Sequence, residues 1–184
     1  MDPDRSLVLQ AAAGSRPAFD ELVERYRRRV YNLVWALSCD HPDVEDLVQD
    51  IFVRAYRSVH GFRGDSSFRS WLYRISVNVV HNHRDSRAFK EMARGLDLES
   101  AEGVPQLSKD DDVEGTMARR QGIDRALATL PPDMRLLVIL RDVHGLSYDE
   151  IARIVKMRPG TVDSKLFRAR QRLRPMLEQY VSRA

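Results

Sequence analysis

The sequence predicts an all-α protein made of two small helical domains joined by a flexible acidic linker, the C-terminal domain being a helix-turn-helix. Helix-forming Ala, Leu, Glu, Gln and Arg are abundant, and no β-branched stretch alternates with period two. The glycines lie mainly at breaks between segments of helical periodicity. Between residues 95 and 115 the periodicity stops, and acidic side chains surround a few glycines and one proline. With 184 residues, 43% of them hydrophobic, the chain can bury a core in each domain.

The formal net charge of +3 is a cancellation between three segments. Residues 1–90 carry a net charge of +2, residues 91–118 carry −6, and residues 119–184 carry +7. Such a partition indicates a nucleic-acid partner for the C-terminal segment, which the whole-chain charge conceals.

The composition also excludes several classes of protein. A single cysteine, Cys39, excludes a disulfide-stapled secreted scaffold. No apolar run approaches the roughly 20 residues of a membrane span, and the acidic start, Met1 to Arg5, does not fit a signal peptide. We therefore expect a soluble, cytoplasmic protein without membrane insertion of its own.

Three helices are predicted in the N-terminal domain. The first covers residues 17–37, where apolar residues recur at helical spacing. The second runs from about residue 44 to 59, with Pro42 in or before its first turn. The third follows a turn at residues 61–64, is capped by Asp65 or a nearby serine, and reaches about Phe89.

The acidic segment is predicted to be a linker, because it has too few apolar residues to offset the entropy lost on ordering. A solvated acidic loop without further function is an equally simple interpretation. The predicted boundaries are residues 1–92, 93–118 and 119–184.

The helix-turn-helix is predicted from residues 146–174. Ser147 and Glu150 have the spacing of a capping box, and an apolar stripe follows them. Residues 156–160 interrupt this short helix, and a longer basic helix restarts at Thr161. Upstream, residues 121–130 and 133–143 form a supporting helical pair around Pro131 and Pro132, and Pro175 is expected to end or kink the last helix.

At 100° per residue, the longer helix has a buried face and an outward face. Val162, Leu166, Ala169 and Leu173 lie together on the first. The outward face and its flanks present donors and cations suited to base edges and phosphates in a major groove. The candidate duplex-binding residues are Thr161, Asp163, Ser164, Lys165, Phe167, Arg168, Gln171 and Arg172. A solvated cationic helix is the alternative interpretation.

The helix at residues 44–59 has a second distinctive face. Asp46, Gln49, Asp50 and Val53 share one side at i, i+3, i+4 and i+7, opposite an apolar core stripe. This face is a candidate docking surface for a protein partner. A solvated face is the better interpretation when it is considered alone.

The turn after that helix, with the helix that follows, combines aromatic, cationic and amide groups. Such groups provide stacking, phosphate neutralisation and base-edge hydrogen bonds for unstacked bases. The candidate single-strand-binding residues are Phe62, Arg63, Asp65, Ser66, Trp71, Arg74 and Asn78. Alternatively, Trp71 and Tyr73 are ordinary core or groove residues.

Together these motifs resemble the extracytoplasmic-function sigma factors of bacterial RNA polymerase. Asp46 to Asp50, the turn from Phe62 to Asp65, and Phe68 and Trp71 to Asn78 resemble region 2 of that family. Leu130 to Pro132, Leu146 to Ala152 and Gly160 to Arg170 resemble region 4. The two sets stand in the family's order and cover nearly the whole chain.

The resemblance implies a two-domain, all-helical initiation factor that directs core RNA polymerase to promoters, often in stress responses. It implies docking on the clamp coiled coil through Asp46, Gln49, Asp50 and Val53, and region 4 contact with the flap of the large subunits. It implies capture of a flipped base of the melted −10 element by residues 62–68, with Asn78 nearby, and −35 duplex contacts by Ser164, Phe167 and Arg168. An anti-sigma factor is an expected partner, and the acidic linker would run near the RNA path.

Asp163 departs from the family pattern, since many members carry Arg, Lys or another non-acidic residue at that position. A carboxylate repels phosphate but can accept a hydrogen bond from cytosine N4. The departure predicts a −35 preference different from that of members with Arg.

Two other functions compete with this hypothesis. An ordinary helix-turn-helix regulator outside the polymerase would need a sensor domain, but the N-terminal domain reads as helices without a receiver-type strand pattern. An enzyme is disfavoured, because Asp46 and Asp50 at i, i+4 could imitate an acid/base pair but nothing supplies an electrophile or a nucleotide cradle. His81 and His83 point in opposite directions on a helix, and Cys39 with His41 is too small a set for zinc. We expect no catalytic residues, no metal and no cofactor.

Overall fold

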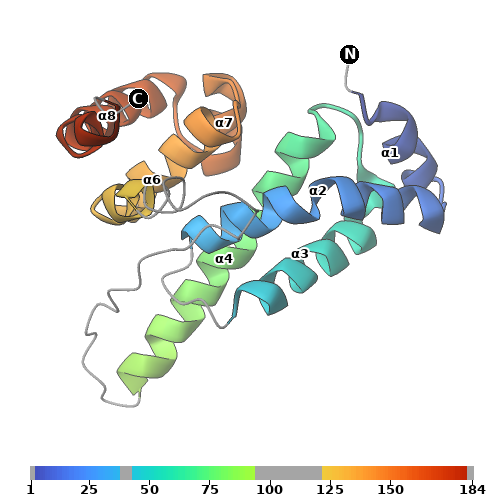
Figure 1. Cartoon of the computed structure of the whole chain (residues 1–184). Helices are drawn as coiled ribbons and strands as arrows, with labels where there is room; N and C mark the ends of the chain where they lie inside the picture. Colours follow the sequence, from blue (N-terminus) through green and yellow to red (C-terminus); the bar gives the residue numbers. More distant parts are fainter. Residues whose placement is uncertain (1–2, 38–42, 94–121, 182–184) are drawn as a thin grey trace. The chain divides into compact units, whose positions relative to one another are not determined.

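The computed structural model describes residues 3–37, 43–93 and 122–181, and these fall into two compact units. The first is made by α1 (Arg5–Ala12), most of α2 (Arg16–Leu37), α3 (Val44–Ser58) and α4 (Phe68–Ala93) (Figure 1). The second contains a helical segment at 122–128, α6 (Pro132–Val138), α7 (Tyr148–Val155) and α8 (Pro159–Val181). No strand occurs within the described ranges, so the predicted all-α class is confirmed.

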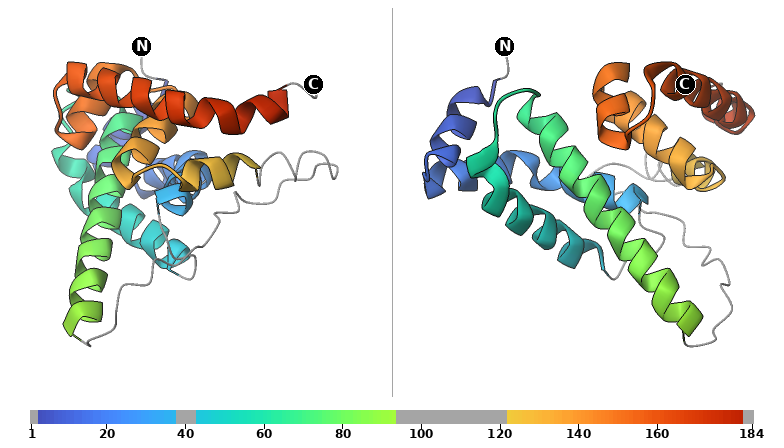
Figure 2. Two further views of the ribbon diagram at one scale, coloured as in Figure 1. Left: turned by 90° about the vertical axis from the view of Figure 1, so that its left-hand side faces the viewer. Right: turned by 180° about the vertical axis from the view of Figure 1, so that it is seen from behind.

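In the first unit, α3 and α4 lie side by side and α2 packs against both (Figures 1 and 2). Aromatic rings join the helices: the centroids of Phe19 and Tyr56 are 5.0 Å apart, and those of Tyr26 and Phe68 are 5.3 Å apart. The stripe predicted on α3 is the buried one, as all five of its residues have less than 9% of their surface exposed. Its members are Leu47, Val48, Ile51, Phe52 and Ala55.

Helix α1 was not predicted from the sequence. It packs through Val8 and Ala11 and against the 3₁₀ turn η1 (Val59–Gly61), which continues α3. Asp4, just before α1, is 4% exposed and is bound by two residues of α2. The start of α1 is therefore held by a buried polar contact in addition to its short apolar side.

The predicted starts of the other N-terminal helices agree closely with the structure. Ser67 caps α4, since its Oγ accepts a hydrogen bond of 3.2 Å from the amide of Ser70. In the turn before it, Gly64 has a φ of +77°, a backbone conformation that L side chains rarely adopt. The helix extends to Ala93, four residues beyond the predicted end at Phe89.

In the second unit, α6 and α7 both pack on α8. The helix predicted at 133–143 is α-helical only to Val138, and residues Ile139–Val143 form a π-helical turn. Leu137, Val138, Ile139 and Leu140 are buried across this junction. The apolar side of this segment is therefore buried on both sides of the junction.

The structure corrects the expected start of α8 and one of the two effects expected of Pro175. The helix begins at Pro159 and not at Thr161, because proline fits the first turn of a helix, where no amide hydrogen is needed. It also continues through Pro175 to Val181, so that proline does not end it (Figure 2). Apart from its first residue, Ala93, the predicted linker at 93–118 lies outside the described residues.

Candidate nucleic-acid interface

The helix pair α7–α8 is held by the predicted capping box. The Ser147 amide donates to Glu150 Oε2 at 2.9 Å, and the Glu150 amide donates to Ser147 Oγ at 3.2 Å. After α7, Lys156 adopts a left-handed conformation with φ 55°, and the chain turns into α8. These features fix where the second helix starts relative to the first.

Helix α8 is anchored by its apolar stripe. Val162, Leu166 and Ala169 are 0% exposed, and Leu173 is 5% exposed. The opposite face is open to solvent, and Phe167 has 62% of its surface exposed. The exposed candidates on this helix are Thr161, Asp163, Ser164, Phe167, Arg168, Gln171 and Arg172. The predicted division of the helix into a buried and an outward face is confirmed.

The two flanks of this face are tied to the supporting helices, which the sequence did not indicate. Lys165 is half-buried, and its Nζ donates to the carboxylate of Asp133 on α6. On the other flank, Arg170 binds Asp142 of the π-helical turn, with 2.5 Å between Nη2 and Oδ1. The Lys165 hydrogen bond lowers the pKa of Asp133, and the Asp142 hydrogen bond raises the pKa of Arg170. Both cations already have a carboxylate partner within the protein.

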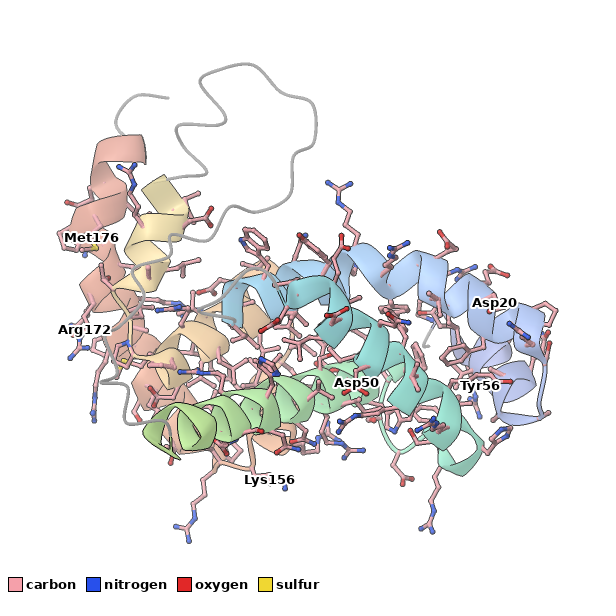
Figure 3. The ribbon with its side chains drawn as sticks, turned by 90° about the horizontal axis from the view of Figure 1, so that it is seen from below. Asp20, Asp50, Tyr56, Lys156, Arg172 and Met176 are labelled. Carbon is pink, nitrogen blue, oxygen red and sulfur yellow. The ribbon has the colours of Figure 1, made fainter. Side chains whose placement is uncertain are left out.

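Helix α3 presents the predicted docking face. Asp46 and Gln49 are exposed, Asp50 is half-buried, and Val53 is 39% exposed. The Asp50 carboxylate binds Arg54 one turn later at 2.8 Å. Tyr56, labelled with Asp50 in Figure 3, is 44% exposed and was not among the predicted residues. Tyr56 follows Val53 by three residues, so helical spacing places it on the same side of α3 as the predicted docking face.

The aromatic residues at the start of α4 form a packed cluster. Phe62 is half-buried, with its ring centroid 5.4 Å from that of Trp71 and 6.3 Å from that of Phe68. Trp71 is 9% exposed and Tyr73 is 0% exposed. Trp71 therefore packs against Phe62 and exposes little of its own ring, and its contact with single-stranded DNA stays a prediction.

Polar side chains lie in the turn before α4 and on the exposed side of that helix. Arg63 and Asp65 in the turn are exposed and Ser66 is half-buried, while Arg74 and Asn78 are exposed one turn apart on α4. Arg74 and Asn78 share a side of the helix because they are four residues apart. The turn and this side of α4 together offer an aromatic edge, cations and an amide.

A cavity of about 450 Å³ lies next to the same turn, and the sequence did not indicate it. Its lining includes Arg25 and Arg29 of α2, together with Ser67 and Arg69 at the start of α4. The i, i+4 spacing of the two α2 arginines is the only sequence pattern among the lining residues that indicates a shared surface. Their partners across the cavity are about 40 residues away in the chain.

The prediction that the chain holds no metal concerns residues of which the structure describes only some. Within the described ranges, no group of three or more His, Cys, Asp or Glu could hold a metal ion. His81 and His83 bind different carboxylates, Asp85 at 2.9 Å and Asp43 at 3.2 Å. Cys39 and His41 lie outside the described residues. Of the helices described, none has the length and apolar character needed to cross a membrane.

Comparisons with known proteins find matches that cover both units. The family model of Sigma-70 region 2 matches residues 22–89, and that of Sigma-70 region 4 matches residues 120–173. The chain is 36% identical to the ECF RNA polymerase sigma-E factor of Escherichia coli K12, covering 98% of this chain and 97% of that protein. It is 34% identical to the RNA polymerase sigma-H factor of Pseudomonas aeruginosa, covering 97% of each.

Two solved structures are also similar over most of the chain. One is CnrH in complex with the cytosolic domain of CnrY, with a TM-score of 0.69, 29% identity, and coverage of 96% of this chain and 97% of that chain. The other is the sigma factor RpoE in complex with the anti-sigma factor NepR from Bartonella quintana. It has a TM-score of 0.72, 28% identity, and coverage of 87% of this chain and 96% of that chain.

Proposed function

We propose a promoter-directing function for this chain, which belongs to the extracytoplasmic-function group of the sigma-70 family of RNA polymerase sigma factors. It binds core RNA polymerase, recognises a −35 and a −10 element, helps to melt the DNA and directs initiation. The observation that carries the proposal is that both sigma regions match in order on two helical units, each with an exposed polar face. Its site of action is the cytoplasm, where the polymerase works.

Each surface has its own role in this proposal. The docking face of Asp46, Gln49, Asp50 and Val53 contacts the clamp coiled coil, and region 4 contacts the flap. The turn from Phe62 to Ser66 holds a flipped base of the −10 element, supported by Trp71, while Arg74 and Asn78 contact the melted strand. The outward face of α8 reads the −35 duplex. The exposure of Asp46, Gln49, Arg74, Asn78 and the outward face of α8 supports the assignments.

An anti-sigma factor is a further proposed partner. The two similar solved structures hold CnrH with the cytosolic domain of CnrY, and RpoE with the anti-sigma factor NepR. By analogy, a regulatory protein would cover one or both polymerase-binding surfaces of this chain and release them on a signal.

Reconstituted transcription tests the function. The purified chain, added to core polymerase with a library of randomised promoters, should yield transcripts enriched in one paired −35 and −10 sequence. Core polymerase alone serves as the control. A chain that binds duplex DNA but supports no promoter-specific initiation would instead be an ordinary helix-turn-helix regulator.

Matched variants test the docking face. Asp46→Ala should weaken the binding of core polymerase, measured by competition with a labelled wild-type chain. Glu45→Ala is the control, because Glu45 is also exposed in the first turn of α3 but lies about 100° away around the helix. The two substitutions remove the same charge from the same helix terminus. Equal losses of polymerase affinity would therefore contradict the assignment of Asp46 to the docking face.

Selection on duplex DNA tests the role of Asp163. Asp163→Arg should change the −35 sequence recovered from the library, because a carboxylate accepts from cytosine while arginine donates to guanine. Identical selected sequences for wild type and variant would contradict a readout role for Asp163.

A further inference from the structure

Asp4 is a buried carboxylate that stands immediately before α1, where an aspartate ordinarily caps the helix that follows it. It is 4% exposed, and its side chain makes no capping hydrogen bond to α1. Its Oδ1 instead accepts from Arg25 Nη1 at 2.8 Å, and its Oδ2 accepts from the hydroxyl of Tyr26. Both oxygens are therefore directed at α2. Asp4 also lies outside residues 22–89, which match the Sigma-70 region 2 family model.

The ring of Tyr26 joins this carboxylate to the aromatic cluster at the start of α4. Its centroid lies 5.3 Å from that of Phe68, edge to face at an interplanar angle of 69°. Phe68 is 1% exposed, and its ring lies 6.3 Å from that of Phe62 and 5.5 Å from that of Trp71. The energy of such ring pairs depends on their orientation. A shift of the Tyr26 ring would therefore change the surface on which Phe68 packs, and with it the support of Phe62.

The surroundings of Tyr26 leave room for such a shift. Asp4, Tyr26 and Ser67 all line the cavity of about 450 Å³ next to the turn. A side chain enclosed on every side is held by its neighbours, but one that borders a cavity lacks those contacts on the open side. A hydrogen bond to a carboxylate is stronger than one between neutral groups. The position of the Tyr26 ring therefore depends on the bond from its hydroxyl to Asp4.

We propose that Asp4 is a positioning residue for the turn at residues 62–66, which is proposed above to hold a flipped base. Asp4 acts through the hydroxyl of Tyr26 and then through the ring of Phe68, on which Phe62 packs. A turn that is already ordered binds a base more tightly, because less conformational entropy is lost on binding. The proposal rests on the capture of a base by this turn.

Removal of single bases from a DNA strand measures base capture directly. The probe is a labelled single strand covering the −10 sequence recovered from the promoter selection, bound to holoenzyme assembled from the full chain and core polymerase. Each base in turn is replaced by an abasic site, and the ratio of intact to abasic affinity is determined at each position. The captured base is the one whose ratio is largest in wild type and is lost in Phe62→Ala.

Asp4→Ala and Tyr26→Phe should each lower the ratio at the captured base by roughly threefold or more, which is the size of one aromatic ring contact. The ratios at the other positions should stay unchanged. Tyr26→Phe keeps the ring and removes only the hydroxyl, so it tests the bond to Asp4 with the packing retained. The double variant should lose no more than either single variant, because both substitutions remove the same contact.

Glu21→Ala and Val8→Ala are the matched controls. Glu21 also binds Arg25, at 2.5 Å, so its removal takes the same charge from the same arginine but leaves both Asp4 and Tyr26 in place. Val8 is fully buried, so Val8→Ala weakens the packing of α1 without removing either of those two side chains. Both controls should keep the wild-type ratio at the captured base, even if Val8→Ala lowers the urea midpoint of unfolding.

A wild-type ratio at the captured base in Asp4→Ala or in Tyr26→Phe would overturn the positioning role. An equal loss in Val8→Ala would overturn it as well, because base capture would then depend on the packing of α1 in general. An equal loss in Glu21→Ala would assign the effect to the charge around Arg25 instead. The ratio compares two strands within each variant, so a partly unfolded preparation does not imitate the expected result.

Failure of the positioning role and failure of base capture give different results. If Phe62→Ala loses the ratio while Asp4→Ala and Tyr26→Phe retain it, base capture stands and the role of Asp4 is wrong. If no position gives a raised ratio in wild type, or if Phe62→Ala changes none, base capture by this turn is wrong and the role of Asp4 falls with it. Promoter-specific initiation by the same preparations tests the wider function independently of both.

Discussion

Replacing Asp133 by asparagine should release Lys165 for contact with DNA. In the folded protein the Lys165 ammonium donates to the Asp133 carboxylate, and the two side chains are 28% and 41% exposed. The bond lowers the pKa of Asp133 below its ordinary value of 3.8, so the pair is charged at neutral pH. Because the folded-state pKa is depressed, the pair stabilises the fold above that value, and the contribution disappears as the pH falls below it.

The expected effects of Asp133→Asn differ for stability and for binding. A partly exposed ion pair contributes at most about 1 kcal/mol to the free energy of unfolding. One additional phosphate contact in duplex DNA makes the log–log slope of affinity against salt steeper by about 0.9. Over a fourfold rise in salt, the affinity advantage of the variant should therefore shrink by about 3.5-fold.

Fluorescence anisotropy with a labelled duplex of random sequence measures the affinity of the full chain for DNA and its dependence on salt. Asp149→Asn is the control, because Asp149 is an exposed carboxylate on α7 in the same unit and has the same charge change. Equal slopes for Asp133→Asn and Asp149→Asn would refute the reasoning, since only general charge would then matter. A shallower slope would show that Asp133 holds Lys165 in its binding position.

Three further outcomes are expected. Ser147→Ala should lower the free energy of unfolding by about 1 kcal/mol through loss of the N-cap, measured by urea denaturation, and an unchanged midpoint would contradict this. Leu166→Ala should cost about 3 kcal/mol because the side chain is fully buried, while exposed Gln171→Ala should change stability by less than about 0.5 kcal/mol in the same assay. Burial raises the pKa of Tyr73 to about 12 from 10.0, so its contribution to stability is complete below pH 10 and is lost as the pH rises to about 12. Wild type should therefore lose about 1 kcal/mol more than Tyr73→Phe between pH 10 and 11, and parallel curves would exclude this effect.

The sequence was sufficient where a pattern lies within one helix. The periodicity of α8 predicted its buried residues, and the spacing of Ser147 and Glu150 predicted the capping box. The stripe on α3 was predicted for the same reason. In each case the relevant partners are three or four residues apart, so helical geometry alone brings them together.

Contacts between distant segments were beyond such patterns. Nothing near Asp4 indicates that its partners are Arg25 and Tyr26, more than 20 residues later, so both α1 and the cavity were missed. The pairing of Lys165 with Asp133 likewise depends on how α6 packs on α8. No spacing in the sequence likewise indicates that Trp71 is 9% exposed and packs against Phe62.

Lys156 lies at the turn between α7 and α8, and it is the only non-glycine residue with positive φ in the described parts of the chain. Its side chain is exposed and is labelled in Figure 3, so a survey of tolerated substitutions based on exposure would treat position 156 as permissive. The backbone predicts a different tolerance profile. Gly and Asn should be accepted, while Val, Ile and Thr should be rejected, because β-branched side chains fit this conformation poorly. Arg153, exposed on the preceding helix, should accept a wide range of residues other than proline and glycine.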